Sequence, residues 1–308
     1  RFTIDFTAQA QAGELDPVIG REQEIRQCID ILARRRKNNP IIVGDAGVGK
    51  TALVEGIAQK VADGQMPARM AEVDILGLDM GLLQAGAGMK GEFENRLKSV
   101  IEEVKASPRA IILFIDEAHT LIGAGGAAGG SDAANLLKPA LARGELRTLA
   151  ATTWSEYKKY FEKDPALTRR FQLVKVDEPD ETAAVAMMRG LAPHYVRSHA
   201  IPIRDEAVVA TVQLSNRFIS GRLLPDKAVD LLDTCAARVA IAQEAQPAAL
   251  SDLERRLEIL QREREALQRE VDEGTATHTA QLERVEAEIA EIEGRCDALR
   301  ATWQRERD

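Results

Sequence analysis

The sequence predicts an α/β fold in which a parallel five-stranded sheet carries helices on both faces, followed by an all-α domain and a helical hairpin. Three patterns support this prediction. Short apolar runs alternate with helical periodicity over residues 39–176, strand patterns stop from 180 to 246, and apolar residues recur at heptad spacing after Leu250. Strands that alternate with helices indicate a parallel sheet covered on both faces. We therefore expect three domains: 1–178, 179–247 and 248–308.

The composition narrows the class of protein. The 308-residue chain carries a net charge of −8 and is 45% hydrophobic. An acidic balance disfavours a nucleic-acid binder, which needs a basic surface, and no apolar run is long enough for a membrane span. Cys28, Cys235 and Cys296 are far apart and show no zinc or disulfide pattern, which predicts a reducing cytoplasm. The chain opens without Met and stops inside a charged helical pattern, so we expect a piece of a longer protein.

The first elements lead into the sheet. Residues 1–16 are expected to form a linker, and a turn at 16–21 precedes a helix over 21–36. That helix ends in four basic residues, 34–37. The basic run binds a polyanion or, as we favour, neutralises the negative end of the helix dipole. The apolar residues 41–43 then predict a buried strand.

Residues 44–51 match the phosphate-binding pattern G-x-x-x-x-G-K-[ST] between that strand and a following helical pattern. Glycines let the backbone close around a phosphate, and amides at the opening of a helix attract an anion. Lys50 is suited to neutralise the β- and γ-phosphates, and the Thr51 hydroxyl to ligate Mg²⁺. The pattern therefore predicts ATP or ADP with Mg²⁺. The loop residues are Gly44, Asp45, Ala46, Gly47, Val48, Gly49, Lys50 and Thr51.

The α/β alternation continues to residue 176. Further strands are expected at 71–78, 110–115, 146–152 and 173–176. Helices are expected at 92–106 and 131–143, the first with an apolar face at helical spacing. Together with the strand at 41–43, these runs make up the five strands of the predicted sheet.

The last part of the chain reads as helix throughout. Patterns at 180–197, 205–219 and 224–244 predict a small all-α domain. Two apolar seams with heptad spacing then flank Gly274. They favour an antiparallel coiled-coil hairpin, and the alternative is one long helix that packs on a partner. The seam residues are Leu253, Leu257, Leu260, Leu267, Val271, Leu282, Val285, Ile289, Ile292, Cys296, Leu299 and Trp303.

Polar residues at strand ends carry the expected chemistry. Asp116 and Glu117 follow an apolar strand, at the edge of a parallel sheet that faces a ligand. Asp116 is placed to hold Mg²⁺ and Glu117 to polarise an attacking water, while Thr153 ends the next strand and can reach the γ-phosphate or the water. Arg169 and Arg170 precede the last strand. They contact the domain's own ATP or the ATP of a neighbouring subunit, or they are a surface pair with no role in the site.

One loop of small residues remains ambiguous. Residues 85–91 include Gly88, Met89 and Lys90. A methionine on a glycine-rich loop suits a non-specific grip on polypeptide. A plain connector fits the residues equally well.

Together these motifs resemble those of the AAA+ ATPases. Their order, with the phosphate loop, 115–117, 152–153 and 169–170, is that of the family. More narrowly, the whole chain resembles the first ATPase module of the ClpB/Hsp104 group of disaggregases. The stretches that carry this likeness are 91–98, 136–146 and 224–228. Within the group it looks most like ClpV, the ATPase of type VI secretion, because Trp154 stands where general disaggregases usually have an aliphatic residue.

The resemblance implies a role for each candidate residue. The phosphate loop becomes Walker A, and Asp116 and Glu117 become Walker B. Thr153 becomes the sensor 1 residue. Arg169 and Arg170 become arginine fingers that act on the neighbouring subunit. Gly88, Met89 and Lys90 become a central-pore loop, in which Met89 replaces the usual tyrosine and predicts a different grip on substrate. The nucleotide-binding set gains Val18, Ile19, Leu53 and Pro225, with Val18, Ile19 and Pro225 flanking the adenine.

The resemblance also implies the setting of the activity. It predicts an ATPase and unfoldase of the bacterial cytoplasm that forms a homo-hexamer in the full-length protein and threads or remodels polypeptide. The expected substrate is the subunits of the contracted type VI sheath, with no nucleic acid and no membrane span. A general disaggregase is one alternative, and a module that uses ATP only to assemble rings is another. Glu117 and the arginine pair favour turnover, because a gate needs only binding.

Overall fold

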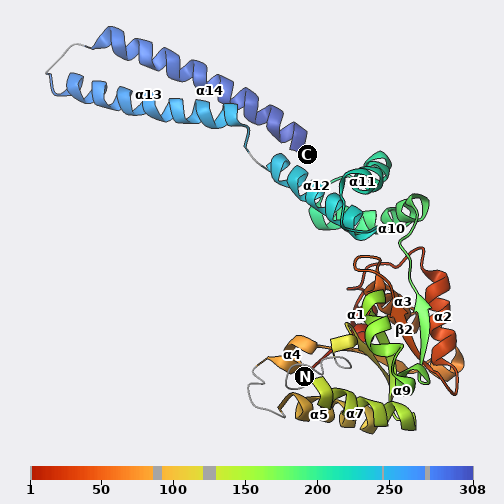
Figure 1. Ribbon diagram of the computed structural model, residues 1–308. Helices are drawn as coiled ribbons and strands as arrows, with labels where there is room; N and C mark the ends of the chain where they lie inside the picture. The colour runs from red at the N-terminus through yellow and green to blue at the C-terminus, as the bar shows by residue number, and fades with distance from the viewer. Residues whose placement is uncertain (1, 86–91, 121–129, 245, 275–277, 308) are drawn as a thin grey trace. The chain divides into compact units, whose positions relative to one another are not determined.

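The computed structural model describes residues 2–85, 92–120, 130–244, 246–274 and 278–307 (Figure 1). Contacts group the chain into two compact units, residues 1–234 and 235–308. The first unit holds an α/β sheet and lid helices, and the second holds a helical hairpin. In the described part of the chain, no helix is both long and apolar enough to cross a membrane. The domain boundaries expected at 178/179 and 247/248 stay predictions.

A six-stranded sheet forms the centre of the first unit. The strand order is β1-β3-β4-β5-β2-β6. β1 pairs antiparallel with β3, and the other neighbours pair in parallel. The strands are β1 (Thr3–Asp5), β2 (Asn39–Val43), β3 (Val73–Leu78), β4 (Ala110–Ile115), β5 (Arg147–Thr152) and β6 (Phe171–Lys175).

The predicted five-stranded parallel sheet is therefore wrong by one strand, because β1 adds an antiparallel edge. The expected linker over residues 1–16 is wrong for the same reason, since β1 leads directly into helix α1 (Phe6–Ala12). Three residues are too few to show an alternating pattern. Asp5 caps α1 by accepting a hydrogen bond from the Ala8 amide (2.9 Å). Phe6 is buried and packs edge-on against Phe114, with ring centroids 5.8 Å apart.

Helices cover both faces of the sheet, as predicted. Successive strand residues point to opposite faces, so Ile42 joins one buried cluster while Ile41 and Val43 join another. The first cluster lies under α1, α2 (Glu22–Leu32) and α3 (Lys50–Ala62). The second lies under α5 (Glu92–Ala106) and α7 (Gly130–Arg143). Five short elements also belong to the α/β region: η1 (Ala68–Met70), α4 (Met80–Gln84), α8 (Trp154–Glu156), the π-helical η2 (Tyr157–Phe161) and α9 (Pro165–Thr168).

The helix expected over 21–36 is shorter than predicted. α2 ends at Leu32, and the basic run 34–37 follows as an exposed turn before β2. Its charges therefore lie beyond the last helical turn, and the interpretation as helix-end charges is wrong. Lys37 adopts a positive φ of 48°. The chain leaves the helix after Leu32 because it must turn back to enter β2.

The lid is all-α, as predicted. It comprises α10 (Glu181–His199), α11 (Asp205–Phe218) and α12 (Asp226–Glu244). Asp180 caps α10 by accepting a hydrogen bond from the Ala183 amide (2.7 Å). Met188, Val208, Val212, Leu224 and Leu232 belong to the buried cluster that joins the lid helices.

The second unit contains the predicted antiparallel hairpin, with α13 (Ala248–Asp272) packed against α14 (Thr279–Arg307). Ion pairs fix the direction, because partners on α14 have falling numbers as those on α13 rise. Glu254 pairs with Arg300 (2.5 Å) and Arg256 with Glu288 (3.0 Å), and Glu270 Oε2 lies 2.9 Å from Nε2 of His278, just before α14. The apolar seam between the helices is buried at eight residues, and partly buried apolar side chains pack against them. The alternative of one long helix is excluded, since α13 stops before Gly274, which has a φ of 70°.

Candidate active site

A pocket of about 530 Å³ opens at the carboxyl ends of β2, β4 and β5. Parallel sheets bind ligands at this edge. The walls come from the phosphate loop, the ends of β4 and β5, the segment before α2 and the lid. They include Asp16, Val18, Ile19, Arg21, Ala46, Gly47, Val48, Gly49, Lys50, Thr51, Glu55, Asp116, Glu117, Thr152, Thr153, Glu156, Met187, Leu191, Tyr195, Pro225, Asp226 and Val229.

The phosphate loop joins β2 to α3 through left-handed glycines. Gly47 and Gly49 have φ values of 86° and 90°, a region that glycine enters without steric cost. Gly44 starts the loop in close contact with β6, because an added Cβ would lie 2.4 Å from the Val176 carbonyl oxygen. The loop thus brings its amides to the opening of α3. Such a cradle at a helix N-terminus favours an anion.

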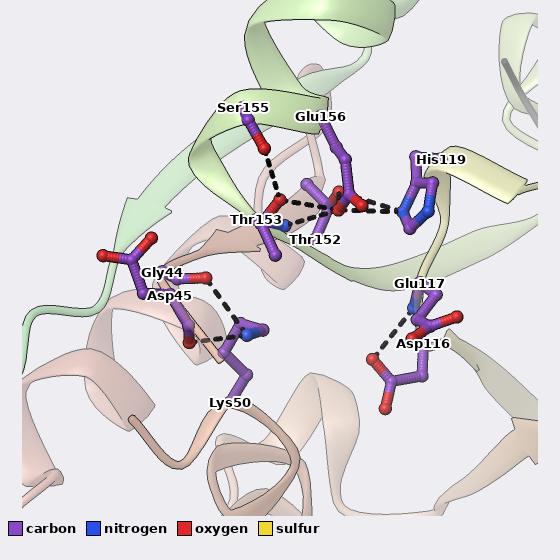
Figure 2. A network of polar contacts seen from close by, with 10 residues as sticks. All are labelled: Gly44, Asp45, Lys50, Asp116, Glu117, His119, Thr152, Thr153, Ser155 and Glu156. Carbon is purple, nitrogen blue, oxygen red and sulfur yellow. Dashed lines mark hydrogen bonds and ion pairs between the residues drawn. The ribbon is translucent and has the colours of Figure 1, made fainter. Parts of the chain in front are cut away.

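Lys50 lies in the middle of this cradle. Its ammonium donates hydrogen bonds to the carbonyl oxygens of Gly44 (3.0 Å) and Asp45 (2.8 Å), as Figure 2 shows. Burial lowers the pKa of Lys50, while the charges of Asp116, Asp45 and other acids act in the opposite direction. A partly desolvated ammonium gains stability from a bound anion. The position therefore suits a phosphate.

Thr51 and Asp116 meet beside Lys50. The Thr51 hydroxyl donates a hydrogen bond to Asp116 Oδ2 (3.3 Å), although the two residues lie on different elements. A hydroxyl and a carboxylate are oxygen ligands of the kind that Mg²⁺ uses next to phosphates. These two side chains therefore fit the predicted ion.

Glu117 adopts an unusual backbone. Its φ is 45°, in the left-handed region, and its side chain is exposed. Its amide donates to Asp116 Oδ1 (2.9 Å), and the next amide, of Ala118, donates to the Ala151 carbonyl oxygen of β5 (2.9 Å). A non-glycine residue held in this region costs on the order of 1–3 kcal/mol and persists only when its surroundings fix it. Such strain clusters at functional sites.

Thr153 belongs to a network that sequence reasoning did not predict. Its hydroxyl donates to Glu156 Oε2 (2.7 Å), and the same oxygen lies 3.1 Å from His119 Nδ1 (Figure 2). The sequence did contain a signal, because Thr153 and Glu156 have the T-x-x-E spacing of a capping box. Glu156 and Thr153 both line the pocket.

Apolar side chains also line the pocket. Val18, Ile19 and Pro225 line it, where the resemblance places them. Three lid residues join them, Met187, Leu191 and Tyr195, and none was predicted from sequence. Leu53 does not join them. It is fully buried in the core cluster with Ile57, one turn later on α3, so a nucleotide contact by Leu53 is not supported.

Two charged residues at the pocket were also missed. Arg21 is buried, and its guanidinium donates to the carbonyl oxygens of Val48 (2.8 Å) and Asp177 (3.0 Å). It ties the phosphate loop to the segment that leads into the lid. Glu55 lies on α3, and burial together with the charge of Asp16 raises the pKa of its carboxyl. Neither residue belongs to a contiguous motif.

Arg169 and Arg170 lie at the opposite edge of the sheet. The buried Asn39 side chain donates to the Arg170 carbonyl oxygen (3.2 Å), and Asn39 pairs with Phe171 where β2 and β6 begin. The pocket lies beyond the other end of β2, about 15 Å away for a strand of this length. The arginines are therefore not brought into the pocket of their own chain. Gly88, Met89 and Lys90 lie outside the described residues.

Comparisons with known proteins identify two family matches along the chain. Residues 40–176 match the ATPase family associated with various cellular activities (AAA), and residues 180–286 match an AAA lid domain. The chain is 58% identical to the AAA+ ATPase ClpV1 of Pseudomonas aeruginosa over 307 residues, covering 100% of this chain and 34% of that protein. It is 54% identical to the chaperone protein ClpB of Yersinia enterocolitica over 310 residues, which again cover 100% of this chain and 34% of that protein.

Solved structures extend the likeness to three dimensions. The Hsp104–ADP complex of S. cerevisiae is 43% identical, with a TM-score of 0.90 over 100% of this chain and 43% of that one. Hsp104 with ATPγS and FITC casein is 48% identical, with a TM-score of 0.73 over 79% of this chain and 42% of that one. This chain spans about a third of the length of the curated relatives. It belongs to the ClpB/Hsp104/ClpV family of AAA+ ATPases and corresponds to their first ATPase module with its lid.

Proposed function

We propose that this chain hydrolyses ATP as part of a ring motor that pulls on polypeptide, and that its substrate is the contracted sheath of a type VI secretion system. The observation that carries the ATP-dependent part is the meeting of Lys50, Thr51, Asp116, Glu117 and Thr153 around one pocket. They come from three different strand ends. Their residue types are those that phosphoryl transfer to water needs.

Each residue has a distinct task in this proposal. The loop amides and the Lys50 ammonium bind the phosphates, and the apolar side chains that line the pocket take the adenine. Thr51 and Asp116 would hold Mg²⁺, which would supply positive charge next to the phosphates. Glu117 accepts a proton from the attacking water, and Thr153 helps to orient that water. The lid closes over the base through Leu191, Tyr195 and Pro225.

The arginine pair supports a ring, which we propose to be a homo-hexamer. Arg169 and Arg170 directly precede β6, at the edge opposite the pocket, so they serve a nucleotide bound to another copy. The exposed basic turn 34–37 lies next to Asn39 at the same edge. This edge therefore offers cations to an anionic neighbour. An arginine supplied in trans stabilises the charge of the transferring phosphoryl group.

The type VI substrate is supported by the similarity to ClpV1 and by Trp154. Identity to ClpV1 is 58%, against 54% to ClpB, so the margin is small. Trp154 starts α8 directly after Thr153 and packs edge-on against Tyr157, with ring centroids 6.2 Å apart. The residues proposed to grip the substrate polypeptide are Gly88, Met89 and Lys90. A general disaggregase is the second candidate, favoured by the ClpB identity and by a relative solved with casein.

Two measurements test the proposal. ATP hydrolysis by the purified protein, with Lys50→Ala as the control for the site, tests the ATPase. Capture from lysates on the full-length protein with Glu117→Gln, which is expected to hold substrate, tests the partner. Enrichment of sheath subunits over heat-aggregated protein supports the type VI role. Enrichment of aggregated protein instead favours the disaggregase.

A further inference from the structure

One oxygen of Glu156 collects contacts from two neighbouring strand ends. Oε2 accepts hydrogen bonds from the Thr153 hydroxyl (2.7 Å), the Thr153 amide (3.1 Å) and the Thr152 hydroxyl (3.2 Å). It also lies 3.1 Å from His119 Nδ1. Thr152 ends β5, whereas His119 follows β4. Figure 2 shows the carboxylate between Thr153 and the imidazole ring, so one side chain joins the two segments that carry Thr153 and Glu117.

The carboxylate is charged where it makes these contacts. Burial alone would raise the pKa of Glu156, but hydrogen bonds from Thr153, the charge of His119 and the Thr152 hydroxyl lower it overall. A charged acceptor forms stronger hydrogen bonds than a neutral one. Glu156 therefore holds its partners more firmly than an amide in the same place would.

Glu117 needs such an anchor nearby. Its φ of 45° persists only if the flanking residues are fixed. On the carboxyl side, Ala118 is tied to Ala151 through its amide, and His119 is held by Glu156. His119 also stacks on Tyr160, with ring centroids 6.2 Å apart and planes at 18°. Glu156 thus acts on a residue two positions from Glu117.

The contact also determines whether the Thr153 hydroxyl donates or accepts a hydrogen bond in the pocket. A hydroxyl has one proton and two lone pairs. Its 2.7 Å hydrogen bond commits the Thr153 proton to Glu156, and Ser155 Oγ, 3.1 Å away, then donates to one of the two lone pairs, which leaves the other for a ligand. Thr153 lines the pocket, so it faces a ligand there as an acceptor. A water in the pocket can then donate one proton to Thr153 and the other to Glu117.

We propose that Glu156 is a positioning residue for hydrolysis, which fixes the Thr153 hydroxyl directly and the Glu117 backbone through His119. This inference rests on the proposed ATPase function of the same pocket. Glu156 does not take the proton from water and does not bind the phosphates. Its loss misplaces the two groups that orient the water, while the loop that binds nucleotide stays intact.

Steady-state ATP hydrolysis by the full-length protein tests the proposal with two variants and a matched control. Glu156→Ala should lower kcat about 10- to 100-fold, since small misplacements of a catalytic group cost this much. KM and ADP affinity should change by less than about threefold, because the Lys50 ammonium is held by the Gly44 and Asp45 carbonyl oxygens and not by Glu156. Glu156→Gln keeps an acceptor oxygen and should recover part of kcat. Glu162→Ala, an exposed glutamate after η2, should behave as the unchanged protein.

A double-mutant cycle and hydrogen exchange test whether Glu156 acts on the Glu117 backbone through His119. His119→Ala and Glu156→Ala together should cost clearly less than the product of the single effects, because they break one chain of contacts. Backbone amides of residues 117–120 should exchange faster in Glu156→Ala than in Glu162→Ala. Unchanged kcat, a parallel loss of ADP affinity, or unchanged exchange would overturn the proposal. If the unchanged protein binds no nucleotide, the proposed function fails, and the exchange measurement still decides whether Glu156 anchors this segment.

Discussion

The Thr51 hydroxyl donates a hydrogen bond to Asp116 Oδ2, 3.3 Å away and 65 residues later in the chain. Thr51 belongs to the first turn of α3, and Asp116 directly follows β4. Two motifs that are separate in the sequence thus meet at one point. Because β4 and β2 are both parallel to β5, which lies between them, their carboxyl ends reach the same edge. The sheet topology therefore assembles the site, and substitutions at individual residues test it.

We expect Lys50→Ala to lose nucleotide affinity and to keep the fold. The ammonium contacts carbonyl oxygens of the loop and packs in no hydrophobic cluster. A hydrogen bond between charged partners contributes about 1.5–3 kcal/mol, so affinity should fall at least about 10-fold. Isothermal calorimetry with ATP and a thermal melt measure the two effects. Lys60→Ala is the matched control, since Lys60 lies at the far end of α3 and contacts Gln65. Equal ATP affinity in both variants would contradict the phosphate-loop assignment.

We expect Glu117→Gln to separate binding from turnover. Glutamine keeps the shape of the side chain but does not take up a proton from water. ATP affinity should stay near that of the unchanged protein, and hydrolysis in the assembled enzyme should fall about 10²-fold or more. Phosphate release under saturating ATP measures turnover, with Glu102→Gln on the surface of α5 as the control. Near-normal turnover would mean that another group activates the water.

The parts of this site that were predictable are contiguous in sequence. Gly44 to Thr51 and Asp116-Glu117 are short patterns whose residue types state their chemistry. Leu53, which the resemblance adds to the nucleotide-binding set, is buried in the core cluster and does not line the pocket. Arg21 and Tyr195 were missed because their pocket contacts join segments far apart in the chain. Glu156 could have been found from its capping-box spacing with Thr153.

The fold was predictable for similar reasons. Buried strands and long amphipathic helices have strong periodicity, and α5 and β4 have the predicted bounds. β1 escaped prediction because three residues carry no period and because its pairing with β3 is a contact between distant segments. The end of α2 was placed too late, since the basic residues after Leu32 have good helix propensity. The helix nevertheless ends at Leu32, because the chain has to turn before it enters β2 at Asn39.

We expect Ile289→Asp to unfold the hairpin locally and to leave the nucleotide site working. Ile289 is 5% exposed in the seam between α13 and α14. An unpaired charge buried there costs several kcal/mol. Circular dichroism should show a loss of helix, while calorimetry shows unchanged ATP affinity. Ile259→Asp is the matched control, because Ile259 is 52% exposed on the same hairpin. Loss of ATP binding in Ile289→Asp alone would show that the hairpin supports the ATPase region.

The last prediction concerns Arg169 and Arg170 and tests the ring. Their anchor is the Asn39 side chain at the start of β2, whereas the pocket lies beyond the end of that strand. An arginine that stabilises the phosphoryl group in trans affects turnover and not binding. The 308-residue chain as a monomer should therefore bind ATP and hydrolyse it slowly. In the full-length protein, changing both arginines to Ala should keep ATP affinity and lower turnover about 10³-fold or more.

Mixing two inactive full-length variants makes this test specific. A subunit with both arginines changed to Ala keeps its own Glu117, and a Glu117→Gln subunit keeps its arginines. In a mixed ring the Glu117→Gln subunit supplies its arginines to the pocket of the subunit that lacks them, so some turnover should return if subunits exchange. Light scattering must confirm rings in the mixture and monomers in the isolated chain. A monomer that hydrolyses ATP as fast as the ring would show that no neighbour is needed. The arginines would then have no task in trans. They would have none in cis either, because at the far edge of the sheet they are too distant to act on the pocket of their own chain.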